Sequence, residues 1–250
     1  MPTIDINCDM GEGFPSDALL MRYISSANIA CGYHAGDADT MKRTVDLCLK
    51  HNVAIGAHPS YSDRENFGRT DMMYKGLQPE DLPEIIGEQI NLLNIICKAA
   101  GATLHHVKPH GALYNRAAKD ETVSRHICST IVEVSRSLIL YGLSGSQMES
   151  QAALHNLPFR CEVFADRTYQ LDGSLRPRSA PDALITDTSQ CIRQVMQMIR
   201  KGMVTTVEQK EIPMRAETIC IHGDGAHAVE FASSIHRELT EKGIVISHTL

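Results

Sequence analysis

The sequence lacks the features that mark several large classes of protein. It has no basic excess, because 24 Lys and Arg stand against 30 Asp and Glu, a formal net charge of -6, so we do not expect nucleic acid as a partner. The longest apolar runs, such as the one near Leu92, fall far short of the roughly 20 residues that span a bilayer. The N-terminus has no basic-then-apolar signal pattern. We therefore expect a soluble, cytoplasmic protein with no membrane partner.

Paired cysteines and familiar catalytic or nucleotide-binding loops are also missing. The eight cysteines are scattered without a CxxC pair, and most lie in apolar patterns, where a free cysteine packs as a small hydrophobe. Neither GxxxxGKS/T nor GxGxxG occurs, so neither of these loops holds a nucleotide. The stretch GLSGS around Ser144 does not have the GxSxG spacing of a nucleophile elbow. We expect reduced cysteines and no serine nucleophile.

What the chain does contain is an alternation of short apolar segments and longer amphipathic ones. With 250 residues and 43% hydrophobic content, it can bury a large core, and we expect one domain over residues 1–250. The alternation is typical of βαβ units and a largely parallel sheet. Predicted strands cover residues 3–7, 27–31, 53–57, 104–108, 138–142, 161–165 and 218–222, with a short one near Ile244; predicted helices include 79–100 and one capped by Asp39. This pattern suits an open doubly wound sheet or a closed barrel.

Polar side chains follow almost every predicted strand. Ligands bind at the carboxyl ends of strands in both architectures, so we expect these side chains to form one site. They are Asp9 and Glu12, His34 and Asp37, His58 and Arg69, Lys108 and His110, Asp166 and Arg167, and His222 and Asp224. Helix capping explains Asp37 and Asp39 at least as well as catalysis. Of His105 and His106, within the strand pattern, we expect one to face the helix layer as a core histidine.

The histidines also leave a metal site open. His34, His58, His110 and His222, with Asp9, have the residue types of a His/carboxylate site. No HExxH or comparable local spacing supports one. The sequence therefore does not decide whether a divalent metal is bound.

Six long blocks run in order from about Ile4 to Val245: INCDMGEG, SANIACGYHAGD, GAHPSYSDRENFGR, HVKPHGALYN, EVFADRTYQLDGSLRPRS and CIHGDGAHA. Together they resemble the lactam-utilisation family, the A subunits of 5-oxoprolinase. The resemblance implies an α/β fold, an irregular (β/α) barrel with about seven parallel strands, similar to the glycoside hydrolase and deacetylase barrels. It also implies an ATP-dependent enzyme that opens 5-oxo-L-proline (pyroglutamate) to L-glutamate, yields ADP and phosphate, and works with partner subunits B and C.

This reaction gives the strand-end residues expected roles. If ATP phosphorylates the lactam oxygen, water must attack the product, which requires a base, cations and oxyanion donors. We expect Asp9 or Glu12 to act as base and Lys108 and His110 to polarise the carbonyl. The expected catalytic set is Asp9, Glu12, His58, Lys108, His110 and Asp166, and the expected substrate-binding set is His34, Arg69, Asn115, Arg167, Arg178, His222 and Asp224. Arg167 or Arg178 is expected to pair with the substrate carboxylate.

Two other hypotheses remain open. The barrel and the histidines also suit a metal-dependent, deacetylase-like amide hydrolase that acts alone. A non-catalytic subunit that only presents substrate to its partners is the other, although such a pocket is mostly apolar with few polar anchors. The sequence also leaves a homo-oligomer open.

Overall fold

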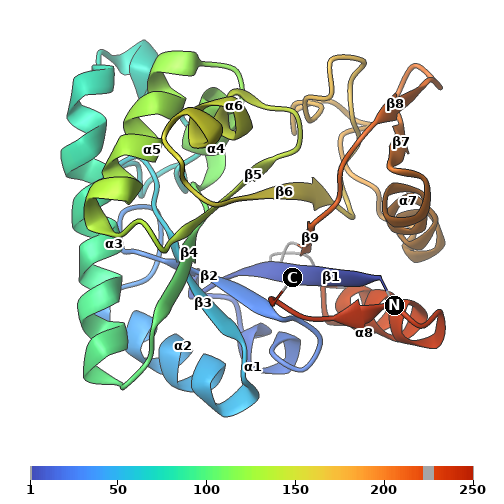
Figure 1. Cartoon of the computed structure of the whole chain (residues 1–250), viewed down its shortest axis with the longest axis horizontal. Helices are drawn as coiled ribbons and strands as arrows, with labels where there is room; N and C mark the ends of the chain where they lie inside the picture. Colours follow the sequence, from blue (N-terminus) through green and yellow to red (C-terminus); the bar gives the residue numbers. More distant parts are fainter. Residues whose placement is uncertain (1, 222–227, 250) are drawn as a thin grey trace.

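The computed structural model describes residues 2–221 and 228–249, and its centre is a closed barrel of parallel strands surrounded by helices (Figure 1). The 8-stranded sheet has the order β10-β1-β2-β3-β4-β5-β6-β9, and an additional pairing of β1 with β9 closes it. The strands are β1 (Thr3–Met10), β2 (Ser26–Ala30), β3 (Ala54–His58), β4 (Leu104–Val107), β5 (Ile139–Leu143), β6 (Phe159–Phe164), β9 (Thr218–Ile221) and β10 (Val245–Ile246). The short β10 pairs with the first two residues of β1. The predicted barrel is thus confirmed, and the open sheet is excluded.

The helices follow the strands in the order that the sequence predicts. They are α1 (Asp17–Leu20), α2 (Ala38–His51), α3 (Leu82–Ala99), α4 (Gly111–Ala117), α5 (Glu121–Val134), α6 (Gln147–Leu154), α7 (Thr188–Lys201) and α8 (Ala228–Glu241), with 3-10 turns η1 (Met72–Lys75) and η2 (Pro79–Asp81). The predicted N-cap of α2 is wrong by two residues. The cap is Asp37, whose side chain accepts a 2.7 Å hydrogen bond from the Thr40 backbone N–H, and Asp39 lies in the first helical turn.

The barrel is irregular between β6 and β9. Here the chain makes a long excursion through α7 and an antiparallel pair, β7 (Met203–Thr205) and β8 (Glu211–Pro213), that lies outside the barrel sheet (Figure 1). The sequence pattern does not predict these two strands, because three residues each are too short for a periodic pattern. The strand predicted for residues 218–222 ends at His222, which lies outside the described residues. The corresponding β9 ends at Ile221.

The interior of the barrel is polar, although the strands read as apolar runs in the sequence. At the end where the strands begin, Asp5 is 1% exposed and accepts hydrogen bonds from Ser25 Oγ (2.5 Å), Ser26 Oγ (2.8 Å) and Thr218 Oγ1 (2.6 Å). Burial raises the pKa of Asp5, and these hydrogen bonds lower it in part. This network closes one end of the barrel with its donors and acceptors matched.

The core histidine of the fourth strand is His106, and it faces the interior of the barrel rather than the helix layer. Its Nε2 lies 2.8 Å from Asn28 Oδ1, and its ring stacks on Tyr141 with centroids 4.0 Å apart. Gly56 of β3 makes room for this ring, because a Cβ at that position would lie 2.1 Å from His106 Nε2. His105, its neighbour, is only half-buried.

All eight cysteines are buried and free, as expected.

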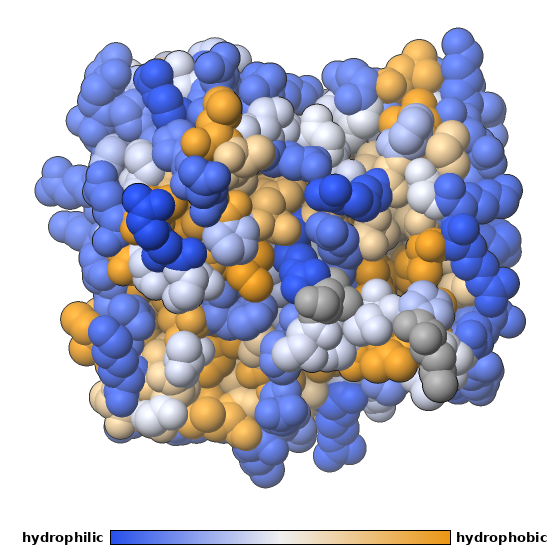
Figure 2. Space-filling model, viewed as in Figure 1, coloured by the Kyte–Doolittle hydropathy of each residue, from blue (hydrophilic) through white to orange (hydrophobic). Residues whose placement is uncertain are grey.

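Figure 2 shows that hydrophilic residues form most of the outline of the visible face and also lie in its middle. Within the described residues, no helix combines the length and apolar character needed to cross a membrane.

Candidate active site

A cavity of about 710 Å³ opens at the carboxyl end of the barrel. The residues that follow β1, β3, β4 and β6 line it, as the parallel arrangement of the strands predicts. Of the predicted site residues, the lining includes Asp9, Glu12, His58, Arg69, Lys108, His110, Asn115, Arg167 and Arg178. His34 lies against this group without being part of the lining, and half-buried Asp166 is not among the lining residues either. The predicted His222 and Asp224 lie outside the described residues.

Lys108 lies at the base of the cavity between two carboxylates. It continues from β4, where its backbone N–H donates to Ala57 O, and it is 2% exposed. Its Nζ is 2.9 Å from both Asp9 Oδ1 and Glu162 Oε1 and 3.2 Å from Asn7 Oδ1. Burial works to lower the pKa of Lys108, but the charges around it, that of Asp9 first, hold the pKa well above 10.5. Lys108 is therefore a fixed cation.

Asp9 is held so that its two oxygens have different surroundings. Oδ1 accepts hydrogen bonds from Lys108 Nζ and, at 2.8 Å, from Asn28 Nδ2. Oδ2 lies 3.4 Å from His58 Nε2. The carboxylate is 8% exposed and lines the cavity. One oxygen is thus anchored to the barrel, and the other faces the histidines.

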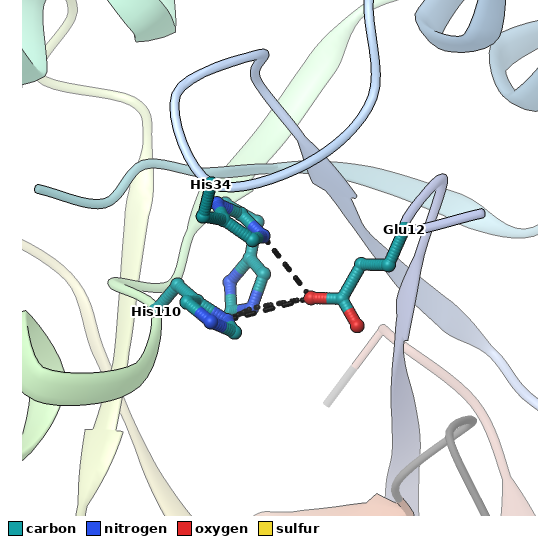
Figure 3. Close-up of side chains that lie close together, drawn as sticks. Glu12, His34 and His110 are labelled. Atoms are coloured by element: carbon teal, nitrogen blue, oxygen red, sulfur yellow. Dashed lines mark hydrogen bonds and ion pairs between the residues drawn. The ribbon is translucent and has the colours of Figure 1, made fainter. Parts of the chain in front are cut away.

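Three histidines and Glu12 converge beside Asp9. The side-chain ligand atoms of Glu12, His34, His58 and His110 all lie within 4.8 Å of one another. Figure 3 shows Glu12, from the loop after β1, pointing at His34 and His110. The Oε1 atom of Glu12 is 3.1 Å from His34 Nε2, 3.4 Å from His110 Nδ1 and 3.9 Å from His58 Nε2. The rings of His34 and His110 stack with centroids 3.8 Å apart.

Two glycines allow the loops to come this close. Gly68 has φ +64°, and a Cβ there would lie 2.9 Å from His110 Cδ2 and 3.0 Å from His34 Cβ. Gly111, at φ +54°, packs on the Gly68 carbonyl, where a Cβ would approach to 2.6 Å. The stretches GYHAG, NFGR and KPHGA thus fold into one compact support for the rings.

Burial keeps two of these rings uncharged. Desolvation, followed by the neighbouring His58, lowers the pKa of His34 to about 3, and the same causes hold the pKa of His110 well below 6.5. At neutral pH, both rings are therefore neutral imidazoles. A neutral ring with its N–H already used cannot also donate a hydrogen bond to a substrate.

Several arginines line the cavity. Arg167 is 5% exposed and donates from Nη2 to Arg176 O at 2.6 Å. Burial, followed by the charge of Arg178, lowers the pKa of Arg167. Arg178 is exposed, and Arg69 lies over the Phe67 ring at 5.1 Å. The mouth is therefore suited to an anionic ligand.

Three polar residues that contact Lys108 or Asp9 lie outside the site that the sequence predicts. Asn28 and Glu162 lie inside apolar strands, and Asn7 ends another predicted strand. All three are 0% exposed and contact Lys108 or Asp9. The signal that could have found them is period-2 alternation, since Asp5, Asn7 and Asp9 share one face of β1.

Comparisons with known proteins agree with this architecture. The model of the LamB/YcsF family matches residues 4–250. A protein of Brevibacillus brevis that is named as the A subunit of 5-oxoprolinase is 48% identical over 99% of this chain and 98% of its own length, and one of Bordetella parapertussis with the same name is 46% identical over 98% of each.

Solved structures show the same fold. The crystal structure of a lactam utilization protein from Thermus thermophilus superposes with a TM-score of 0.91 at 36% identity and covers 98% of this chain and 99% of that one. The peptidoglycan deacetylase PdaC from Bacillus subtilis, at 14% identity, 98% and 87% coverage and a TM-score of 0.51, shares the barrel fold alone. By its full-length match to the family and to these relatives, the chain belongs to the LamB/YcsF family.

Proposed function

We propose that this chain is the A subunit of an ATP-dependent 5-oxoprolinase, which opens the lactam of 5-oxo-L-proline to L-glutamate together with subunits B and C. The names of the full-length relatives support the role, and a protein named as one subunit implies partner subunits. The observation that carries the proposal is the Asp9–Lys108–Glu162 group under an arginine-lined cavity. We further propose that residues 1–250 act as one catalytic domain.

In this proposal Asp9 is the general base for water. It lines the cavity, with Oδ1 bonded to Lys108 and Oδ2 on the side of His58, and we assign Oδ2 to accept a proton from a water beside the lactam carbonyl. Lys108 donates to Asp9 and Asn7 and lies beside Glu162. We therefore assign it to orient Asp9 rather than to polarise the carbonyl.

The mouth of the cavity supplies the cations. The substrate carries one carboxylate, and a phosphorylated intermediate would carry further negative charge. Arg167 and Arg178 line the same cavity, and a guanidinium fork matches the two oxygens of a carboxylate or phosphate. We assign these two arginines, with Arg69, to bind the anionic groups of the substrate.

A metal-dependent amide hydrolase that acts alone is the second candidate. The group of Glu12 with three histidines favours it, since such residues hold catalytic metals in amide hydrolases. The two candidates differ in whether ATP and partner subunits are needed.

The test is glutamate release from 5-oxo-L-proline by this chain with its B and C partners, with and without ATP. We expect release only from the complete mixture with ATP. Asp9→Asn should lower the rate by about 10²- to 10⁴-fold, the usual contribution of a general base. Glu65→Gln, on the exposed part of the loop after β3, is the matched control and should leave the rate unchanged. Ring opening by this chain alone without ATP would establish the second candidate.

A further inference from the structure

We propose that Glu12, His34, His58 and His110 bind a divalent transition metal ion of borderline softness, with Zn²⁺ the ion that fits best. The inference concerns the pocket described above but does not depend on which amide is opened. It rests on the hydrogen bonds behind the rings, which determine where each ring carries its proton.

Each histidine uses one ring nitrogen for a partner that can only accept a hydrogen bond from it. His58 Nδ1 lies 2.7 Å from Lys108 O, and His110 Nε2 lies 2.9 Å from Phe67 O. A backbone carbonyl has no proton to give, so both nitrogens carry N–H. His34 Nδ1 lies 3.0 Å from Ser60 Oγ, whose own proton goes to Tyr61 O at 2.8 Å. His34 therefore also donates from Nδ1.

The remaining nitrogen of each neutral ring is then a bare lone pair, and the three lone pairs meet. His58 Nε2 and His110 Nδ1 are 2.9 Å apart. Two nitrogens without hydrogens repel at that distance unless a cation lies between them. A single proton between them would satisfy only this pair. A metal ion satisfies both nitrogens, together with His34 Nε2 and Glu12 Oε1.

The separations that involve Glu12 are close to those expected around a single four-coordinate ion. An ion with Zn–N and Zn–O bonds of about 2.0–2.1 Å sets its tetrahedral ligand atoms about 3.4 Å apart. The distances from Glu12 Oε1 to the three rings are 3.1, 3.4 and 3.9 Å. Three imidazoles and one carboxylate suit Zn²⁺ and its first-row neighbours, whereas Mg²⁺ and Ca²⁺ prefer oxygen ligands.

The contacts behind the rings are those that a metal site requires. Ligand histidines commonly donate their second N–H to a carbonyl or another acceptor, which fixes the ring and strengthens the ligand. All three rings have such a partner here. Asp9 lies outside the four ligands, but its Oδ2 is 3.4 Å from His58 Nε2, so it would lie directly beside the bound ion.

The test is metal binding by the full chain, purified without a histidine tag and stripped with a chelator. Calorimetric titration should show one Zn²⁺ per chain and no comparable binding of Mg²⁺, and Co²⁺ should give the visible absorption of a tetrahedral site. His58→Gln should abolish Zn²⁺ binding. Ser60→Ala removes the acceptor behind His34, along with the hydroxyl's own hydrogen bond to Tyr61 O, and should weaken Zn²⁺ binding by about 10- to 100-fold. His155→Gln, at a half-buried histidine that follows α6 and contacts Gln151 O rather than any of the four ligands, should bind as the wild type does.

Circular dichroism and the melting temperature show whether each variant is folded. If His58→Gln does not fold, Ser60→Ala decides. A folded wild type that binds neither Zn²⁺ nor Co²⁺, or a folded Ser60→Ala with unchanged Zn²⁺ affinity, overturns the proposal. The two proposals can fail separately. ATP-dependent ring opening by a complex whose A subunit binds no Zn²⁺ would overturn the metal site and leave the proposed function standing. Tight Zn²⁺ binding without ATP-dependent ring opening would overturn the proposed function and leave the metal site standing.

Discussion

The two ends of the barrel interior are both polar and both buried, yet they differ in what their polar groups contact. At the amino end, hydroxyl groups of neighbouring strands surround the single carboxylate of Asp5. At the carboxyl end, Asp9, Glu162 and Lys108 bring three charges together under a cavity of about 710 Å³, beside converging histidine lone pairs. Buried polarity alone therefore does not mark a site. Charges that converge beneath an opening do.

The largest effect should come from removing the cation at the carboxyl end. Lys108→Met leaves Asp9 and Glu162 buried without their shared ammonium, and breaking a buried ion pair in this way costs about 3–5 kcal/mol. We expect that loss in denaturant unfolding, together with loss of turnover. Lys119→Met, at an exposed lysine that lines the same cavity, should change the free energy of unfolding by no more than about 0.5 kcal/mol. Equal stability of the two variants would show that the Lys108 charge group does not hold this end together.

The amino end should respond in stability rather than in catalysis. Asp5→Asn replaces an oxygen that accepts a hydrogen bond with an NH₂ group, so at least one buried hydroxyl loses its acceptor. We expect a cost of about 1–3 kcal/mol in the free energy of unfolding and unchanged turnover per folded protein. If fully folded Asp5→Asn protein showed a large fall in turnover, the amino end would also take part in catalysis, and the two ends would not differ as described.

The boundary between the ends can be probed through a glycine. Gly56→Ala forces a methyl group into the His106 ring, which lies against Asn28 and Tyr141, and overpacking of this kind costs about 1–3 kcal/mol. Gly87→Ala in α3 is the matched control, because its Cβ would meet only Thr130 Cγ2 at 3.6 Å. This change should stabilise the protein by about 0.4–1 kcal/mol. In thermal unfolding, Gly56→Ala should lower the melting temperature and Gly87→Ala should raise it.

The last prediction concerns pH. Burial, followed by the charges of its neighbours, holds the pKa of His106 well below 6.5 in the folded protein. Below pH 6.5 the unfolded chain therefore binds a proton that the folded chain does not, and the free energy of unfolding falls as the pH falls. His106→Gln removes this proton. Between pH 6.5 and about pH 5, the free energy of unfolding of this variant should fall less steeply with falling pH than that of the wild type, by up to about 1.4 kcal/mol per pH unit. Parallel slopes for variant and wild type would contradict the assignment.

Much of the fold followed from sequence because each strand is a short apolar run and each helix is amphipathic. The barrel strands and α3 lie within a few residues of where periodicity predicts them. The β7–β8 pair and the cap of α2 did not follow, since three-residue strands carry no period and two aspartates competed for one cap. The strand periodicity left open whether the sheet closes.

The candidate site was predictable in its residues but not in its contacts. The rule that sites form at the carboxyl ends of parallel strands placed Asp9, His58 and Lys108 together, and the structure confirms this proximity. The rule could not show that Lys108 is shared between two carboxylates or that Glu12, rather than Asp9, faces all three rings. Those facts depend on side-chain directions and on the close approach of Gly68 and Gly111, which local sequence does not encode.

The most direct test compares two variants of the complete complex. The rate of glutamate release with Asp9→Asn is divided by the rate with Asp5→Asn, each corrected for the fraction of folded protein. Both variants exchange a buried aspartate on the same face of β1 for asparagine. We predict a ratio of about 10⁻² or lower, as expected for loss of a general base. A ratio near one would mean that the carboxyl end of the barrel is not where the lactam is opened.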